Sequence, residues 1–95
     1  MEQLFFKNDV LEATLWEDGW VFVLWLNNRI GYLSKSFIKT MKFIEQQIQE
    51  RKLTGWICNS EKEHTTMHGI IRKFGGTEFT ESPGLLWFKK EMNHV

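Results

Sequence analysis

A histidine pair and a lone cysteine are the side chains of this sequence whose types and spacing could most readily support chemistry. His64 and His68 stand at positions i and i+4, so on a helix they share one face, and such a pair can bind zinc. The intervening residues include no glutamate, so the metalloprotease motif is absent. We therefore expect exposed histidines that flank an apolar stripe, and no metal site.

Cys58 is the only cysteine in the chain, so it cannot form an internal disulfide. It ends an apolar segment just before an expected helix, and a helix N-terminus can lower the pKa of a thiol and create a nucleophile. A nucleophile also needs a base, and only His64 or His68 is near in sequence. Free cysteine commonly behaves as a small hydrophobic residue, so we expect Cys58 to be buried and structural.

The segment 53–79 contains the elements that must position these side chains. Ser60 and Glu63 have the spacing of a capping box, which marks the start of a helix. The apolar spacing that follows predicts a helix over 61–74, and Gly75 can adopt the left-handed conformation that ends it. The apolar stripe of this helix consists of Met67, Ile70, Ile71 and Phe74.

The whole chain is expected to form strands and helices in the order β-β-β-α-β-α-β-β. A helix is expected over 34–52, where apolar residues recur with a period near 3.6. The expected strands are 4–6, 10–16, 20–26, 53–58, 77–82 and 85–89. This order predicts an α/β (α+β) fold, in which both helices pack on a mixed sheet of about six strands whose first two form an antiparallel edge. Because 20–26 is apolar throughout, we expect it to be a central strand covered on both faces.

Composition limits the class of protein. The 95 residues suit one domain spanning 1–95, and 42% hydrophobic residues can build a core without disulfides or metal. Twelve basic residues balance twelve acidic ones, which argues against a nucleic-acid-binding protein. The longest apolar run, 20–26, is far shorter than the ~20 residues of a membrane helix, and no signal peptide is visible. We expect a cytoplasmic protein that binds neither nucleic acid nor membrane.

The order of elements resembles that of the GNAT-type acyl-CoA N-acyltransferases, especially their short, diverged bacteriophage members. In that family a buried strand, a loop and a long helix follow one another, which here correspond to 21–26, 27–33 and 34–52. A later helix ends in a lysine–apolar–glycine signature, and its counterpart here is Lys73-Phe74-Gly75-Gly76. The resemblance covers roughly residues 20–90 and implies a small mixed sheet and an acetyl-CoA-dependent activity on an amine.

The residues that would hold the cofactor depart from the family's pattern. The family has Arg/Gln-x-x-Gly-x-Gly/Ala before its long helix, where backbone amides bind the CoA diphosphate. Here only Arg29 and Gly31 remain, at a different spacing. If acetyl-CoA binds, the resemblance assigns it to Asn28, Arg29, Gly31, Ser34, Lys35 and Asn59.

The residues that would transfer protons differ as well. The family's general acid, often a tyrosine, corresponds here to Ile71, which cannot protonate a leaving thiolate. His64 falls where many members have asparagine. The remaining candidates for acid–base catalysis are His64, Tyr32 and Glu78. The family also usually has helices between its first strands, which shape the acceptor site, whereas this chain has only a turn at Asp18-Gly19.

Tryptophan is abundant, with five residues in the chain, and two of them are candidate interface residues, Trp16 and Trp20. Alternation places Trp16 on the strand face opposite Leu11 and Ala13. If no helix covers that face, Trp16 is exposed and can anchor a protein interface. The alternative is a sheet covered on both faces.

Two functions remain open from the sequence. The missing acid, the incomplete phosphate loop and the tryptophans favour a catalytically degenerate phage accessory protein that binds a virion protein, a host factor or another copy of itself. The alternative is an active N-acetyltransferase, in which the loop 27–36 holds the diphosphate of acetyl-CoA and His64 or a carboxylate deprotonates the amine. The sequence does not decide whether the protein is an enzyme.

Overall fold

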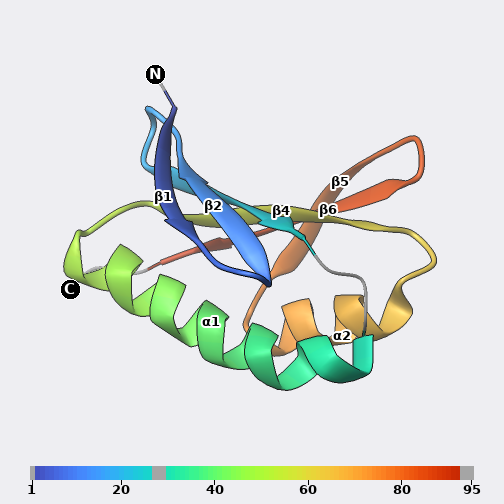
Figure 1. Ribbon diagram of the computed structural model, residues 1–95. Coiled ribbons are helices and arrows are strands. Elements are labelled where there is room, and N and C mark those ends of the chain that lie inside the picture. Colours follow the sequence, from blue (N-terminus) through green and yellow to red (C-terminus); the bar gives the residue numbers. More distant parts are fainter. Residues whose placement is uncertain (1, 27–29, 93–95) are drawn as a thin grey trace.

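The described part of the chain folds into one mixed sheet of six strands with two helices (Figure 1). The computed structural model describes residues 2–26 and 30–92. The elements are β1 (Gln3–Lys7), β2 (Leu11–Leu15), β3 (Trp20–Trp25), α1 (Ile30–Glu50), β4 (Gly55–Glu61), α2 (Thr65–Lys73), β5 (Thr77–Ser82) and β6 (Leu85–Glu91). This succession confirms the predicted fold class and order.

The strands lie side by side in the order β1-β2-β3-β4-β6-β5. Only β3 and β4 are parallel, because α1 carries the chain back along the sheet between them. All other neighbours are antiparallel, and β6 returns between β4 and β5. The predicted antiparallel edge is thus formed by β1 and β2.

Both helices lie on the same face of the sheet, below it in the view of Figure 1, and the core fills the space between the two layers. Strand alternation turns one set of apolar side chains toward the helices. The fully buried residues of this layer include Leu11, Ala13, Val21, Val23, Trp56, Cys58 and Phe88 from the sheet, and Phe37, Met41, Ile44, Ile48 and Ile71 from the helices.

The opposite face of the sheet, called the open face below, has no helix over it in the part of the chain that the structure describes (Figure 1). Consecutive residues of β3 show the difference, since Val23 is fully buried whereas Leu24 keeps 44% of its surface exposed. The prediction that 20–26 is covered on both faces is therefore wrong. Its continuous apolar sequence supplies the core on one side and an apolar outer surface on the other.

Helix α2 begins later than its sequence suggests. Ser60 and Glu61 pair with Leu86 and Leu85 of β6, so β4 continues through the predicted helix start. The residue before the helix, His64, makes no side-chain capping hydrogen bond. The predicted capping box at Ser60 is therefore wrong, because pairing with a distant strand outweighs a local helix signal.

Both helices end in the same hydrogen-bonded loop, in which one residue is left-handed. At the end of α2, Gly75 has φ 93°, as predicted, and the Gly76 amide donates to the Ile71 carbonyl over 3.0 Å. At the end of α1 the left-handed residue is Lys52, with φ 53°, and the Leu53 amide donates to the Ile48 carbonyl over 3.0 Å. This loop follows the last residue of α1, Glu50. The helix spans 30–50, whereas the sequence predicted 34–52.

Candidate functional site

One candidate site is a hollow at the carboxyl ends of the parallel strands, called the strand-end hollow below. β3 and β4 pair from Trp20 and Gly55 up to Val23 and Cys58, and they no longer pair beyond that point. The hollow between their ends has a volume of about 200 Å³. It is lined by Leu24, Trp25, Asn59, Ser60, Glu61, His64 and Leu85.

Polar groups of the strand-end hollow can bind or deprotonate a small ligand. His64 Nε2 lies 3.6 Å from Glu61 Oε2, so the imidazole is placed beside a carboxylate. The Ser60 hydroxyl is buried and has no hydrogen-bond partner within the described residues. The Trp25 indole N–H donates to the Asn59 carbonyl over 2.9 Å. This carbonyl oxygen lies just beyond the last paired residues of β3 and β4, and the indole already occupies it. Space for a further ligand is correspondingly limited.

Among the predicted catalytic and cofactor residues whose side chains the structure describes, only His64 and Asn59 lie together, in the strand-end hollow. Lys35 is exposed on α1, outside the strand-end hollow. Glu78 lies on edge strand β5, and its Oε1 is 3.3 Å from Nη2 of Arg72 on α2. Glu78 therefore pairs with α2 instead of lining the hollow.

The predicted phosphate loop falls partly outside the described residues, which exclude Asn28 and Arg29. From Ile30 onward the backbone belongs to α1, so Gly31, Tyr32 and Ser34 lie in a helix and not in a loop. Only their backbone is described. An extended diphosphate-binding loop over 27–36 is therefore not found in the described part of that segment.

Cys58 and His68 are both structural in this fold. Cys58 is fully buried, and burial raises the pKa of its thiol far above the usual value, which leaves no thiolate to act as a nucleophile. His68 is buried too, and its Nε2 lies 2.9 Å from the Glu61 carbonyl oxygen. The prediction of an exposed His68 is wrong, because its ring ties α2 to the end of β4. Within residues 2–26 and 30–92, no group of three His, Cys, Asp or Glu side chains is placed to hold a metal ion.

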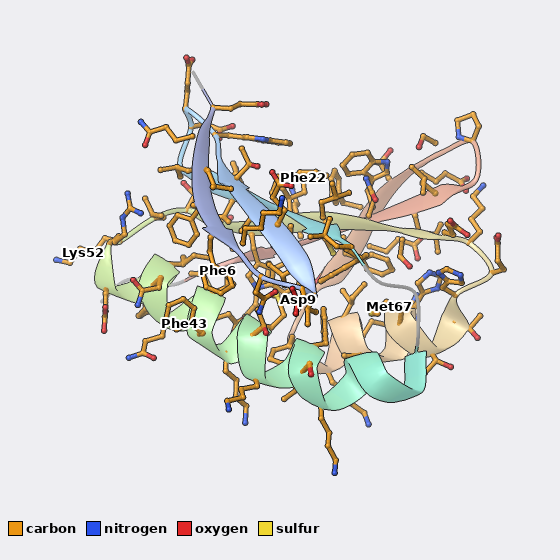
Figure 2. The ribbon with its side chains drawn as sticks, in the orientation of Figure 1. Phe6, Asp9, Phe22, Phe43, Lys52 and Met67 are labelled. Carbon is orange, nitrogen blue, oxygen red and sulfur yellow. The ribbon has the colours of Figure 1, made fainter. Side chains whose placement is uncertain are left out.

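The second candidate site is a row of aromatic rings on the open face. The rings of Trp16 and Phe22 stack with centroids 5.4 Å apart and an interplanar angle of 15°. The Trp87 ring follows, with its centroid 6.0 Å from that of Phe22, and its indole N–H donates to the Ser82 hydroxyl over 3.1 Å. Three aromatic side chains from β2–β3 and β6 are thus fixed side by side. Figure 2 shows Phe22 on the side of the sheet away from the helices, whereas Phe6 and Phe43 meet on the α1 side.

These rings border a hollow of about 400 Å³, called the aromatic groove below. It is lined by Glu2, Glu12, Thr14, Trp16, Phe22, Leu24 and Trp87. Trp16 is half-buried in this row, because its stack with Phe22 covers part of the ring. The sequence placed Trp16 on the correct strand face, but it did not identify Phe22 and Trp87, although alternation with Val21 and Val23 could have separated Phe22 from the core.

Trp20, the other predicted interface residue, belongs to a neighbouring part of the open face. The ammonium nitrogen of Lys89 lies 6.0 Å from the centroid of the Trp20 ring and 5.0 Å from that of Phe79. These distances are typical of cation–π contacts. Trp20 is therefore in contact with a basic side chain of its own chain, whereas the part of the aromatic groove lining that the structure describes contains no basic residue.

Comparison with known proteins gives no match to a family model, to a curated protein or to a solved structure. The two hollows must therefore be judged on their own residues. Within the part of the chain that the structure describes, no helix combines the length and the apolar character needed to cross a bilayer.

Proposed function

We propose that the chain is a binding protein that docks on another protein through the open face of its sheet. The observation that carries this proposal is the row of Trp16, Phe22 and Trp87, which is apolar and has no helix over it. A sheet face of this kind normally packs against a second layer, and exposed apolar patches mark interaction sites. Aromatic side chains are also the residues that most often anchor protein interfaces.

The short connections between the first strands support the same proposal. Gly19, with φ 89°, turns the chain directly from β2 into β3, and the Trp16 amide donates to the Trp20 carbonyl over 2.8 Å. In the GNAT-type enzymes that the sequence resembles, helices between the first strands shape the acceptor site. In this proposal the chain is a catalytically degenerate relative of phage type, whose open face meets a virion protein or a host factor in the cytoplasm.

An acetyl-CoA-dependent N-acyltransferase is the second candidate function. It is favoured by the strand-end hollow, where the unpartnered Ser60 hydroxyl and the His64 imidazole lie together. Against it stand the volume of about 200 Å³, below the roughly 300–1,000 Å³ of most small-molecule sites, and the Trp25 indole, which occupies the Asn59 carbonyl.

Two experiments separate these functions. Thermal unfolding is measured with and without excess acetyl-CoA, and we expect no shift, whereas a cofactor site filled at 100 times its Kd adds about 2.7 kcal/mol of stability. A clear shift would favour the enzyme and overturn the binding proposal.

The binding proposal is tested by capture of partners from an extract of the cells in which the protein acts. We expect a captured protein that is lost with Trp16→Thr and Phe22→Thr, because both changes remove rings from the open face. Ile38→Gln is the matched control, since it removes an exposed apolar side chain from α1 instead. Circular dichroism verifies that all three variants fold. Capture that survives both face variants, or no capture at all, contradicts the proposal.

A further inference from the structure

We infer that the aromatic groove takes a protein segment with a basic side chain, lysine or arginine, next to an apolar one. The basic group would lie against Trp16 between carboxylates, and the apolar group against Leu24 and Trp87. This inference rests on the proposed docking function and names the chemistry of its partner.

The distribution of charge around Trp16 is the first argument. A second hollow of about 360 Å³ adjoins the aromatic groove and shares Trp16 and Glu2 with it. The carboxylates that line the two hollows are Glu2, Glu12, Glu17 and Asp18, and among the described residues no lysine, arginine or histidine lines either of them. The chain as a whole has no net charge, so this acidic region is a local feature and not a result of composition.

The state of the groove carboxylates is the second argument. Within residues 2–26 and 30–92, no ion pair engages Glu2 or Glu12, although Lys7 stands opposite Glu12 in the β1–β2 register. Three carboxylates elsewhere do have a lysine or arginine partner, which is Lys90 for Glu45, Arg72 for Glu78 and Lys62 for Glu81. Within the described residues, the groove therefore holds acidic groups that an arriving cation can pair with, without first breaking an ion pair.

The third argument is the contact that the open face already makes with a cation. Lys89 places its ammonium group near the rings of Trp20 and Phe79. Trp16 offers the same kind of ring with carboxylates added, a combination that attracts ammonium and guanidinium groups. A basic side chain of the partner would make the same cation–π contact with Trp16 that Lys89 makes with Trp20.

Charge also excludes two other occupants. A symmetric dimer through this face would bring the same patch of each copy together, and like charges across an interface oppose association. A nucleic acid would bring phosphates against the same carboxylates, although stacked bases suit aromatic rings. A basic segment of a different protein matches both the rings and the charge.

The test is an NMR titration of the isotope-labelled full chain with three short peptides. One alternates leucine with arginine, one leucine with glutamine and one leucine with glutamate. We expect the arginine peptide to shift the indole N–H signals of Trp16 and Trp87 and to bind about tenfold more tightly than the glutamine peptide. The double variant Glu2→Gln and Glu12→Gln should remove most of that preference, whereas the control Glu63→Gln, on an exposed residue outside the groove, should retain it.

Three results would overturn this inference. Equal or tighter binding of the glutamine or glutamate peptide would leave the open face as a docking surface but refute its preference for cations. Shifts of the Trp87 signal on dilution, abolished by Trp16→Thr, would assign the face to a second copy. Absence of any shift with the arginine peptide refutes the inference but not the docking function, which is refuted by variant-insensitive capture, by no capture in the extract experiment, or by a clear stability shift with acetyl-CoA.

Discussion

Gly69, within α2, and Gly76, just after the helix, provide a stringent test of the packing. Replacing each with alanine should change the free energy of unfolding in opposite directions. A methyl group added at Gly76 would lie 2.7 Å from Ile71 Cγ2 and 2.8 Å from Trp56 Cη2. Both neighbours are core side chains with 1% or less of their surface exposed, so neither can move aside into solvent. Gly69 lies within α2 on its exposed side, and a methyl group added there would meet no described atom within 4 Å beyond its chain neighbours and the backbone of its own helix.

The expected magnitudes follow from these surroundings. Gly76 does not have a positive φ, so alanine can adopt the same backbone conformation with little strain. The effect of Gly76→Ala on stability is therefore steric. Inserting a methyl group into a filled core destabilises a protein by about 1–3 kcal/mol. Gly69→Ala restricts the unfolded chain and fits the helix, which should stabilise the protein by about 1 kcal/mol. The two variants should therefore differ by about 2 kcal/mol or more, which is about 8 °C or more in Tm for a domain of this size.

Urea and thermal unfolding followed by circular dichroism measure both changes, with the wild type as the common reference. A Gly76→Ala protein as stable as the wild type would show that Trp56 and Ile71 do not pack on Gly76 as described. A destabilised Gly69→Ala protein would show that the outer side of α2 is covered. Either result refutes the reasoning.

Further predictions concern the end of α1, the buried thiol and one partly buried ion pair. Lys52→Gly should stabilise the protein by about 0.5–1 kcal/mol in urea unfolding because it relieves a left-handed lysine, whereas Lys52→Ala should bring no such gain. Cys58 should react with Ellman's reagent only after unfolding. Because burial raises the pKa of its thiol, stability should be unaffected by this group below its usual pKa of 9.0 and should fall by about 1.4 kcal/mol per pH unit above it. Cys58→Ala should abolish that decline, and an unchanged slope would contradict the burial. Glu45 accepts from the Trp56 indole over 2.7 Å and from Lys90 over 2.9 Å, so Glu45→Ala should cost about 1–3 kcal/mol in urea unfolding and Lys90→Met about 1 kcal/mol or less. The reverse order would show that the indole N–H does not depend on Glu45.

Local signals predicted those parts of the fold that local chemistry determines. Gly75 can end α2 because its left-handed conformation depends on the local turn and not on a partner distant in sequence. Asp18-Gly19 produces the β2–β3 turn for the same reason. The predicted start of α2 failed for the converse reason. Ser60 is held in β4 by pairing with Leu86, which is distant in sequence, and no pattern within 53–79 predicts that pairing.

The candidate site was predictable only in part. Alternation placed Trp16 on the face away from Leu11 and Ala13, and the structure has it there. It could not show that Trp16, Phe22 and Trp87 form one row, because Trp87 arrives through the antiparallel pairing of β6 with β4. An unbroken apolar strand such as 20–26 is compatible with two covered faces or with one, and only the position of both helices decides between them.

The single parallel pairing divides the sheet into two units that are each built from chain neighbours. One is the meander β1–β2–β3, whose strands follow one another along the chain, and the other is the continuous segment that contains β4, α2, β5 and β6. Joining β3 to β4 requires closure across the whole of α1, which is a slower step than forming a hairpin. Trp16 and Phe22 belong to the first unit and Trp87 to the second. A partially folded chain therefore presents only parts of the aromatic groove, and under the proposed docking function a partner that contacts all three rings would distinguish fully folded molecules from partially folded ones.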